Sequence, residues 1–388
     1  MTLITEAADF AALCQRLAGA PYIALDTEFM RDQTYWPVLC LLQIAGPQEA
    51  AVVDTLAVDL APLAPLLQAP ETVKVFHAGR QDLEIFLKRF DFLPKPIFDT
   101  QVAGMVCGFG EQVAYDTLAR KLAGVNLDKS SRFTDWSRRP LTERQMTYAL
   151  GDVTHLRPIY LKLKDELARN GRAAWIEEEM AILESPDTYD LSPARAWERL
   201  KTRSGDRKLL GNLRALAEWR EQEAQRRDVP RGRILKDEQL FEIAAHAPKT
   251  AEELGRSRGL SGDYARGRMG QGIMAALQAA KPMTPAEMPE RAERPEPQPG
   301  LQPLIDLLKV LLKLRAEEHG VAQKLVANSA DLEFIAAADQ APVMALHGWR
   351  RELFGADALA LKHGRLALTA EGQSVKVLRL DEVAEPAA

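Results

Sequence analysis

A proline-rich stretch from Lys281 to Gly300, KPMTPAEMPERAERPEPQPG, leaves the chain few ways to fold as a single body. Its six prolines lack a backbone donor and fix φ, so the stretch suits neither a helix interior nor a central strand. This composition is typical of a stiff linker that takes no part in a hydrophobic core. The 388 residues are therefore expected to form separate domains on the two sides of the linker.

Within residues 1–170, short apolar runs alternate with helical patterns. The runs YIALDTEF, VLCLLQIAG and AAVVDTL follow one another closely, which favours antiparallel neighbours in one sheet. The run TVKVFHAG is a fourth strand that leads into the helical pattern RQDLEIFLKRF. Another helix is expected after Pro140, because Thr142 and Gln145 have the spacing of a capping box. This order predicts an α/β domain with a mixed sheet flanked by helices.

The rest of the chain is predicted to be helical. A connector at 171–205 precedes a helical domain at 206–283, the linker follows at 284–300, and a second helical domain occupies 301–375. The two helical domains are interpreted as a tandem pair, because EWREQEA and DEQLFEIAA before the linker correspond to KLRAEEH and ADLEFIAA after it. Both are expected to be small and all-α.

The charge of the chain is unevenly distributed. The net charge is −5, but residues 201–281 contain 17 Lys and Arg against 11 Asp and Glu, which leaves the remainder at −11. A basic middle segment suggests a polyanionic partner, although a mixed solvated surface explains the pattern equally well. The three cysteines form no C-x-x-C pair, and the sequence has no signal-peptide pattern or apolar run of membrane-spanning length. We therefore expect a cytoplasmic protein with no membrane partner.

Two carboxylates in the strand YIALDTEF raise the question of function. Side chains alternate along a strand, so Asp26 and Glu28 lie on the same face. Two neighbouring acids repel each other and lose solvation when buried. Either the end of the strand is exposed and solvated, or a positive group lies between the two carboxylates.

Two more acids and a tyrosine occur in places that favour the second explanation. Asp82 lies in the first turns of the helix that follows the fourth strand, and Tyr148 and Asp152 share a helix face at i and i+4. Taken singly, each acid is most simply a solvated helix residue. Together, four acids could converge only with cations between them, and two Mg²⁺ or Mn²⁺ ions prefer such oxygen ligands. Tyr148 would then hold the attacking water.

The motifs DTE, HAGRQD and YALGD resemble the three motifs of the 3′-to-5′ exonuclease superfamily that uses four acidic residues. The tyrosine four residues before the last acid is similar to the tyrosine branch, since Thr147 stands where the other branch has histidine. FDTQ, RFTDWSRRPLTERQMTYALGDV and EWREQEAQRRDVPRGRILKDEQLFEIA also match, so nearly the full chain resembles the bacterial ribonuclease D family.

This resemblance implies a ribonuclease H-like exonuclease domain followed by two small HRDC-like helical domains. It also implies that Asp26, Glu28, Asp82 and Asp152 ligate two divalent metal ions, and that Tyr148 orients the hydrolytic water. The expected reaction is hydrolysis of RNA from the 3′ end with release of nucleoside 5′-monophosphates. The expected substrates are tRNA precursors with single-stranded 3′ ends, and no feature indicates an obligate protein partner.

Several other residues are candidate nucleic-acid contacts. A loop combines basic and aromatic side chains in the way that single-stranded nucleic acid requires, and further candidates lie in HAG and around Pro230: Lys129, Arg132, Trp136 and Arg138 in the loop, with His77, Arg227 and Arg231. Trp136 could instead anchor the loop, His77 could simply end its strand, and the arginines could be solvated. Gln43, within a strand pattern, is expected to have its hydrogen bonds satisfied inside the fold.

Two alternatives remain at the level of sequence. The first is a 3′-to-5′ DNA exonuclease of the same superfamily, because no residue identifies a contact to the ribose 2′-hydroxyl. The second is a non-catalytic nucleic-acid-binding protein with an inactive nuclease core. The five intact motif residues argue against it, since an inactive core has no reason to keep like charges together.

Overall fold

The computed structural model describes residues 3–128, 131, 134–202, 204–288 and 300–380. The candidate contacts Lys129 and Arg132 and most of the proline-rich linker lie outside these ranges. Within them, no helix is long and apolar enough to cross a membrane.

The N-terminal domain is built on a six-stranded mixed sheet in the order β1-β4-β3-β2-β5-β6. The antiparallel pairs β2–β3 and β3–β4 confirm the expectation drawn from the close spacing of the three apolar runs, while β1–β4, β2–β5 and β5–β6 are parallel. The strands are β1 (Leu3–Ile4), β2 (Tyr22–Met30), β3 (Val38–Ala45), β4 (Ala50–Asp54), β5 (Val73–Phe76) and β6 (Ile97–Asp99).

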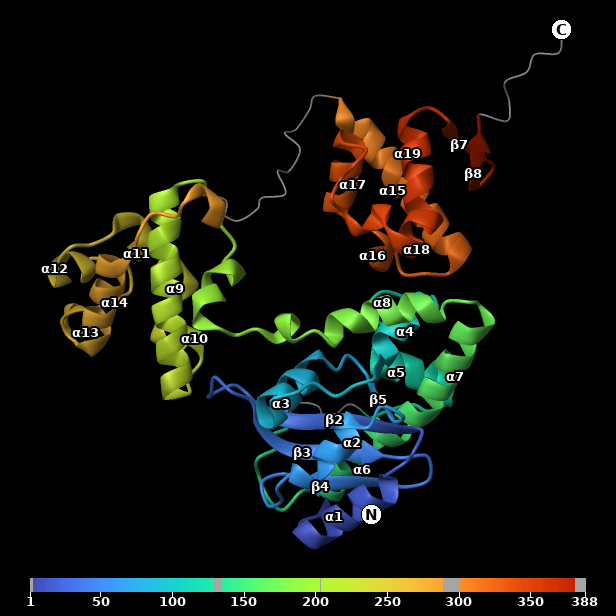
Figure 1. The fold of residues 1–388 in the computed structure, drawn as a ribbon, viewed down its shortest axis with the longest axis horizontal. Helices are drawn as coiled ribbons and strands as arrows, with labels where there is room; N and C mark the ends of the chain where they lie inside the picture. Colours follow the sequence, from blue (N-terminus) through green and yellow to red (C-terminus); the bar gives the residue numbers. More distant parts are fainter. Residues whose placement is uncertain (1–2, 129–130, 132–133, 203, 289–299, 381–388) are drawn as a thin grey trace.

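Helices cover both faces of this sheet (Figure 1). They are α1 (Ala7–Leu17), α2 (Ala64–Gln68), α3 (Arg80–Phe90), α4 (Thr100–Val106), α5 (Tyr115–Leu118), α6 (Glu143–Thr154), α7 (Leu156–Arg169) and α8 (Ala173–Leu183). Helix α6 packs on β2, β3 and β4, and its predicted capping box is confirmed, since Thr142 and Gln145 bond reciprocally. It therefore lies over the face that carries Asp26 and Glu28.

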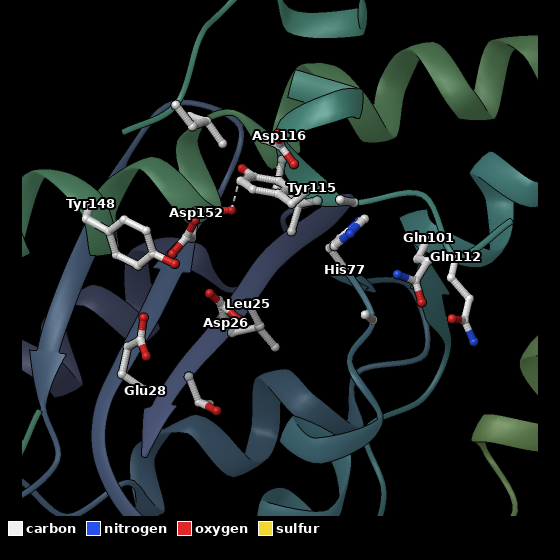
Figure 2. Close-up of a pocket in the computed structure, with 15 residues that line it drawn as sticks. Leu25, Asp26, Glu28, His77, Gln101, Gln112, Tyr115, Asp116, Tyr148 and Asp152 are labelled. Atoms are coloured by element: carbon white, nitrogen blue, oxygen red, sulfur yellow. Dashed lines mark hydrogen bonds between the residues drawn. The ribbon is translucent and has the colours of Figure 1, made fainter. Parts of the chain in front are cut away.

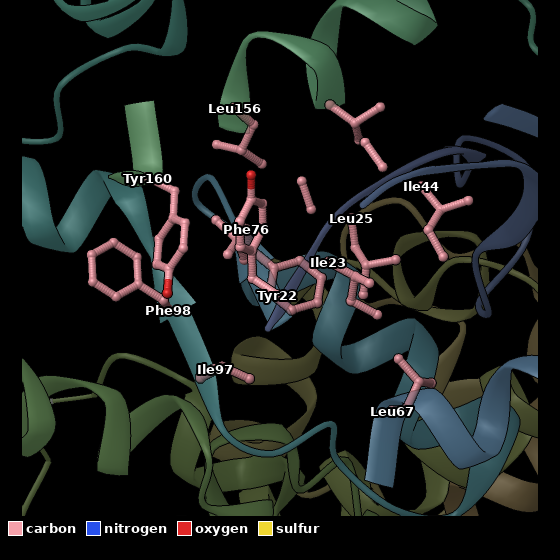
Figure 3. Packing of buried hydrophobic residues seen from close by; sticks show 14 of the residues in the cluster. Tyr22, Ile23, Leu25, Ile44, Leu67, Phe76, Ile97, Phe98, Leu156 and Tyr160 are labelled. Atoms are coloured by element: carbon pink, nitrogen blue, oxygen red, sulfur yellow. The ribbon is translucent and has the colours of Figure 1, made fainter. Parts of the chain in front are cut away.

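A large part of the main core lies on the face of the sheet opposite the two carboxylates. Figure 3 shows Ile23, Leu25 and Ile44 of the central strands packed beside Leu67 and Phe76. These side chains are buried, and they alternate along β2 with the face that carries the two carboxylates. Burial of one face fixes the register of β2, because a slip of one residue would move Asp26 and Glu28 into the core.

The first helical domain has its own core around α9. Its helices are α9 (Arg207–Arg227), α10 (Arg231–Ile234), α11 (Asp237–His246), α12 (Ala251–Leu254), α13 (Gly262–Arg266) and α14 (Arg268–Ala279). Tyr35, in the loop between β2 and β3, belongs to this core, and its hydroxyl donates to the buried carboxylate of Glu221. The nuclease sheet is thus joined to the helical domain next to the strand that carries Asp26.

The second helical domain has a separate core and ends in a β-hairpin. It contains α15 (Leu301–His319), α16 (Gln323–Val326), α17 (Ser329–Ala337), α18 (Gly348–Arg350) and α19 (Ala356–Lys362), followed by β7 (Leu366–Glu371) and β8 (Ser374–Arg379). The hairpin is an addition to the all-α domain that we predicted, and β8 extends past the expected end at 375.

Helix α8 attaches the second helical domain to the nuclease domain. We expected a connector from residue 171, but α8 packs on α4 and β6, and Met180 lies in the nuclease core. On the other side of α8, Trp175 stacks on Trp349 with 4.4 Å between ring centroids. The buried guanidinium of Arg350 pairs with Glu179.

Candidate active site

A pocket of about 690 Å³ opens between the sheet and α6. It is lined by three of the four predicted acids and by the predicted tyrosine: Asp26, Glu28, Asp152 and Tyr148. Figure 2 shows the carboxylates of these acids and the hydroxyl of Tyr148 pointing toward one another. The structure therefore brings together side chains from β2 and α6 that lie more than 100 residues apart in sequence.

The strand β2 presents Asp26 and Glu28 at the point where its pairing with β3 changes. Asp26 is opposite Gln43 and Glu28 is opposite Leu41, and the register shifts between Glu28 and Phe29. Such an irregularity bends a strand and redirects the side chains beside it. Asp26 and Glu28 both precede this shift, so their carboxylates lie on one face of β2, as the alternation predicts.

Asp82, in the first turn of α3, does not line this pocket, but it lies near enough for its charge to raise the pKa values of Asp26 and Glu28. Its buried carboxylate accepts a hydrogen bond from the hydroxyl of Thr27, the residue between Asp26 and Glu28. Asp99 fixes the start of this helix, because its carboxylate accepts bonds from the backbone N–H groups of Ala78 and Gly79 at 3.0 and 2.8 Å. A tight loop in which Ala78 has φ +54° thereby places Asp82.

The helix α6 carries Tyr148 and Asp152 on the face that covers the pocket. The hydroxyl of Tyr115 donates to the backbone carbonyls of Gly151 and Asp152 at 3.0 and 2.7 Å, and so holds the turn around the last acid. The ring of Tyr148 is stacked with Trp136, with 6.0 Å between centroids. These contacts fix where the carboxylate and the phenol point.

Burial favours the protonated forms of all four acids, and repulsion from the neighbouring acids adds to this effect at Asp26 and Glu28. The pKa of Asp26 is raised well above its ordinary value by desolvation and then by the charges of Asp152, Asp82 and Glu28. Desolvation, and then the charges of Asp152 and Asp82, raise the pKa of Glu28 to about 9. Desolvation raises the pKa values of Asp82 and Asp152 to about 7 each, and the Thr27 hydroxyl partly offsets the shift of Asp82. Such shifts occur where a site is built to receive positive charge.

The donor set is chemically suited to hard divalent cations, since it consists of carboxylate oxygens. Within the residues that the structure describes, no three His, Cys, Asp or Glu side chains are grouped closely enough to ligate one ion as they stand. The repulsion among uncompensated carboxylates gives a physical reason for this spacing. Cations would remove the repulsion and allow the acids to approach.

The other predicted contacts have diverse surroundings. His77 lines the pocket, with Nδ1 2.9 Å from the Thr100 hydroxyl, and burial lowers its pKa. Trp136 is buried, with 2% of its surface exposed, whereas the side chain of Arg138 is 83% exposed beside Asp135.

The two candidate arginines of the first helical domain, Arg227 and Arg231, differ in their surroundings. Arg231 forms an ion pair with the buried carboxylate of Glu221, with Nη2 2.7 Å from Oε1, and also bonds the Tyr35 hydroxyl. Arg227 remains 45% exposed at the end of α9. Arg231 is thus engaged inside the molecule, and Arg227 is open to solvent.

Sequence reasoning missed several residues of the site and misjudged one. Tyr115, Gln101 and Gln112 also line the pocket. Gln101 ends the segment FDTQ, which resembles the family but gave it no role, and Tyr115 and Gln112 lie in no motif whose spacing we could interpret. Gln43 is fully buried, and neither its Nε2 nor its Oε1 has a hydrogen-bond partner among the described residues, so the prediction of a satisfied amide is wrong. The unpaired amide lies directly opposite Asp26, a position that strand pairing alone reveals.

Comparison with protein families assigns two parts of the chain. Residues 1–168 match the 3′-5′ exonuclease family, and residues 210–277 match the HRDC domain. The first match contains β2, α3 and α6, and therefore every side chain of the acidic pocket.

Comparison with individual proteins extends over nearly the whole chain. Ribonuclease D of Granulibacter bethesdensis is 51% identical over 385 residues, which cover 97% of this chain and 96% of that protein. Ribonuclease D of Nitrobacter hamburgensis is 50% identical and covers 98% and 100% respectively. The crystal structure of Escherichia coli RNase D, described as an exoribonuclease involved in structured RNA processing, aligns with a TM-score of 0.79 and 31% identity over 94% of this chain and 98% of that one.

Proposed function

The chain belongs to the ribonuclease D family and is a 3′-to-5′ exoribonuclease, and on that premise we propose that it trims single-stranded 3′ ends of tRNA precursors by a two-metal mechanism at the acidic pocket. The fold class expected from the motifs is confirmed by the same matches. The observation that carries the proposal is the convergence of Asp26, Glu28 and Asp152 with the Tyr148 hydroxyl in one pocket.

We assign the metal ligands to the four acids Asp26, Glu28, Asp82 and Asp152. Two Mg²⁺ or Mn²⁺ ions held there would activate a water and stabilise the leaving 3′ oxygen of the scissile phosphodiester. The carboxylates bind the cations in their ionised form, so metal binding releases the protons that the raised pKa values retain. The products are nucleoside 5′-monophosphates.

Tyr148 orients the attacking water in this proposal. Its hydroxyl points toward the carboxylates in the pocket (Figure 2). The stacked ring of Trp136 restricts the direction of the phenol. Holding a nucleophile in line with the phosphorus converts a random encounter into a positioned one. Trp136 therefore acts through Tyr148, since a ring that is 2% exposed is not available for stacking on a base.

The shape of the site suits the end of a single strand. The pocket of about 690 Å³ has His77 and Gln101 on the wall opposite Tyr148. A neighbouring hollow of about 550 Å³ also contacts Tyr148 and Asp152 and is lined by Arg144. A terminal nucleotide in the first hollow would leave room for the preceding phosphate near this guanidinium. We place the activity in the cytoplasm, because Cys14, Cys40 and Cys107 are all free.

The test uses a 5′-labelled tRNA precursor with a short 3′ extension, incubated with Mg²⁺, with Mn²⁺ or with a chelator. We expect stepwise shortening that needs metal and is abolished by Asp26→Asn. Asp54→Asn is the matched control, because Asp54 lies in the same sheet but is paired with Arg139. An RNA with a blunt paired end and a DNA strand of the same sequence follow in parallel.

Shortening by wild type and by Asp54→Asn, but not by Asp26→Asn, would support the assigned site and polarity. Metal-independent shortening, or equal activity of Asp26→Asn, would contradict the site. Equal rates on the blunt RNA would contradict the requirement for a single-stranded end, and faster cleavage of DNA would contradict the assigned substrate.

A further inference from the structure

Gln43 lies inside the sheet immediately beside the first predicted metal ligand. It belongs to β3 and is directly opposite Asp26 of β2 in an antiparallel pair. Opposite residues in such a pair project their side chains on the same face, with Cβ atoms close enough for the side chains to interact. The amide of Gln43 and the carboxylate of Asp26 are therefore neighbours under α6, which packs on both strands.

The side chain of Gln43 is buried without hydrogen bonds. It is 0% exposed, and both Nε2 and Oε1 lack a partner among the described residues. A buried amide that makes no bond loses the water it had in the unfolded chain, so an orphan of this kind needs an explanation.

The surroundings of Gln43 point to a single polar partner in the sheet. On its other side β4 places Val52 opposite it, and its neighbours on the same face of β3 are Leu41 and Ala45. These side chains are apolar and buried. Across the pair with β2 stands Asp26, whose carboxylate accepts a hydrogen bond from the backbone of Thr27.

Asp82 has a side-chain hydrogen-bond donor, whereas the amide of Gln43 beside Asp26 makes no hydrogen bond among the described residues. The Asp82 carboxylate is held by the Thr27 hydroxyl, so that acid already has a side-chain donor that orients it. Gln43 stands directly opposite Asp26 in the sheet, and its Nε2 is a donor without a partner among the described residues. Carboxylates that bind metal usually receive such a bond from a neighbouring group, which fixes the oxygen that faces the ion.

We propose that Gln43 is a positioning residue for the metal site: its Nε2 donates to the outer oxygen of Asp26 when that carboxylate turns to hold a cation. The inference rests on the proposed function, because it requires Asp26 to be a metal ligand. Gln43 itself touches neither the substrate nor the cations. Its contribution is to select one orientation of the Asp26 carboxylate.

The test replaces the amide by an apolar side chain of similar length, Gln43→Met, with Gln43→Leu as a second variant. Leu41→Met is the matched control, because Leu41 is buried on the same strand and face but carries no amide. Three quantities are measured on the full chain: Mn²⁺ affinity by calorimetry, resistance to unfolding in chelator, and kcat and KM on a single-stranded RNA.

We expect Gln43→Met to bind Mn²⁺ about 10- to 100-fold more weakly than wild type. It should lower kcat at fixed metal without raising KM, and it should unfold no earlier than wild type in chelator. Leu41→Met should keep the affinity of wild type. A side chain with only a structural role would lower Mn²⁺ affinity and kcat only if its replacement also lowered the stability of the fold.

Two results would overturn the inference, and they are distinguishable. In the first, wild type binds Mn²⁺, Asp26→Asn does not, and both Gln43 variants bind Mn²⁺ as tightly as wild type. This result would remove the role of Gln43 and leave the proposed function intact. A wild type that binds no Mn²⁺ would overturn the proposed function and the inference together.

Discussion

Removing one charge from the acidic pocket should stabilise the metal-free protein. The perturbation is Asp152→Asn, which keeps the size of the side chain and eliminates its ionisation. Desolvation raises the pKa of Asp152 from 3.8 to about 7 in the folded chain. Wild type therefore retains a proton on folding that the unfolded chain has lost, and its stability falls as the pH rises from 4 to 7.

The shift in pKa sets an upper limit on the gain. A carboxyl that moves from 3.8 to about 7 costs about 4 kcal/mol at pH 8. Because Asp152 titrates together with a neighbouring group, we expect a gain of about 2 to 4 kcal/mol for the variant at pH 8. The gain should shrink to a small fraction of this value near pH 4, where the carboxyl is protonated in the folded chain and partly protonated in the unfolded chain.

Hydrogen exchange of the backbone amides of β2 and β3, in chelator at pH 8 and again near pH 4, measures the change in stability within the sheet. Added Mg²⁺ should protect these amides in wild type and much less in Asp152→Asn. Asp54→Asn is expected to change in the opposite direction, because the bonds from Arg139 lower the pKa of Asp54. Loss of stability in metal-free Asp152→Asn at pH 8 would refute the claim that the buried, ionised carboxylate of Asp152 destabilises the folded chain.

Three further predictions concern the surroundings of the pocket. Tyr148→Phe should lower kcat by about 100-fold or more and leave Mn²⁺ affinity within a factor of two, as measured by calorimetry. Trp136→Ala should destabilise the nuclease domain by about 3 to 5 kcal/mol in a urea titration, because the ring is buried. Arg138 is exposed, so Arg138→Ala should change only the salt dependence of KM in steady-state kinetics. Glu221→Gln should cost about 3 kcal/mol by leaving Arg231 unpaired, seen as faster exchange in α9. Because the pKa of Glu221 is lowered, this contribution should be present at neutral pH and be lost as the pH falls through that lowered value.

The sequence predicted the parts of the site that depend on local periodicity. Alternation along a strand placed Asp26 and Glu28 on one face, and the i, i+4 spacing placed Tyr148 and Asp152 on another. The capping box at Thr142 located the start of the helix that carries them. These relations involve neighbours in the chain, so no knowledge of the tertiary fold is needed to see them.

Local periodicity does not predict contacts between segments that are distant in the sequence. Nothing in the motif around Tyr115 shows that its hydroxyl holds the backbone of Asp152, 37 residues away. In the same way, the ion pair of Arg231 with Glu221 and the hydroxyl of Tyr35 depends on how the helical domain packs against a sheet loop. An isolated basic run therefore did not distinguish a surface contact from an internal one.

The C-terminal hairpin had a signal that we did not use. The segment from 368 to 377 alternates apolar and polar side chains on either side of the turn at Gly372, whose φ is +61°. A two-residue loop with glycine between alternating runs is typical of a hairpin. The helical repeat before it favoured helix in the whole domain, and the switch from a period of 3.6 to a period of 2 marks its true end.

The number of Mn²⁺ ions bound by the chain tests the central claim most directly. Calorimetric titration of metal-free wild type at pH 8, repeated in buffers with different heats of ionisation, gives both the stoichiometry and the protons released. Our account predicts two ions per chain, release of protons on binding, and loss of that binding in Asp26→Asn. Binding of fewer than two ions, or binding that Asp26→Asn leaves unchanged, would contradict it.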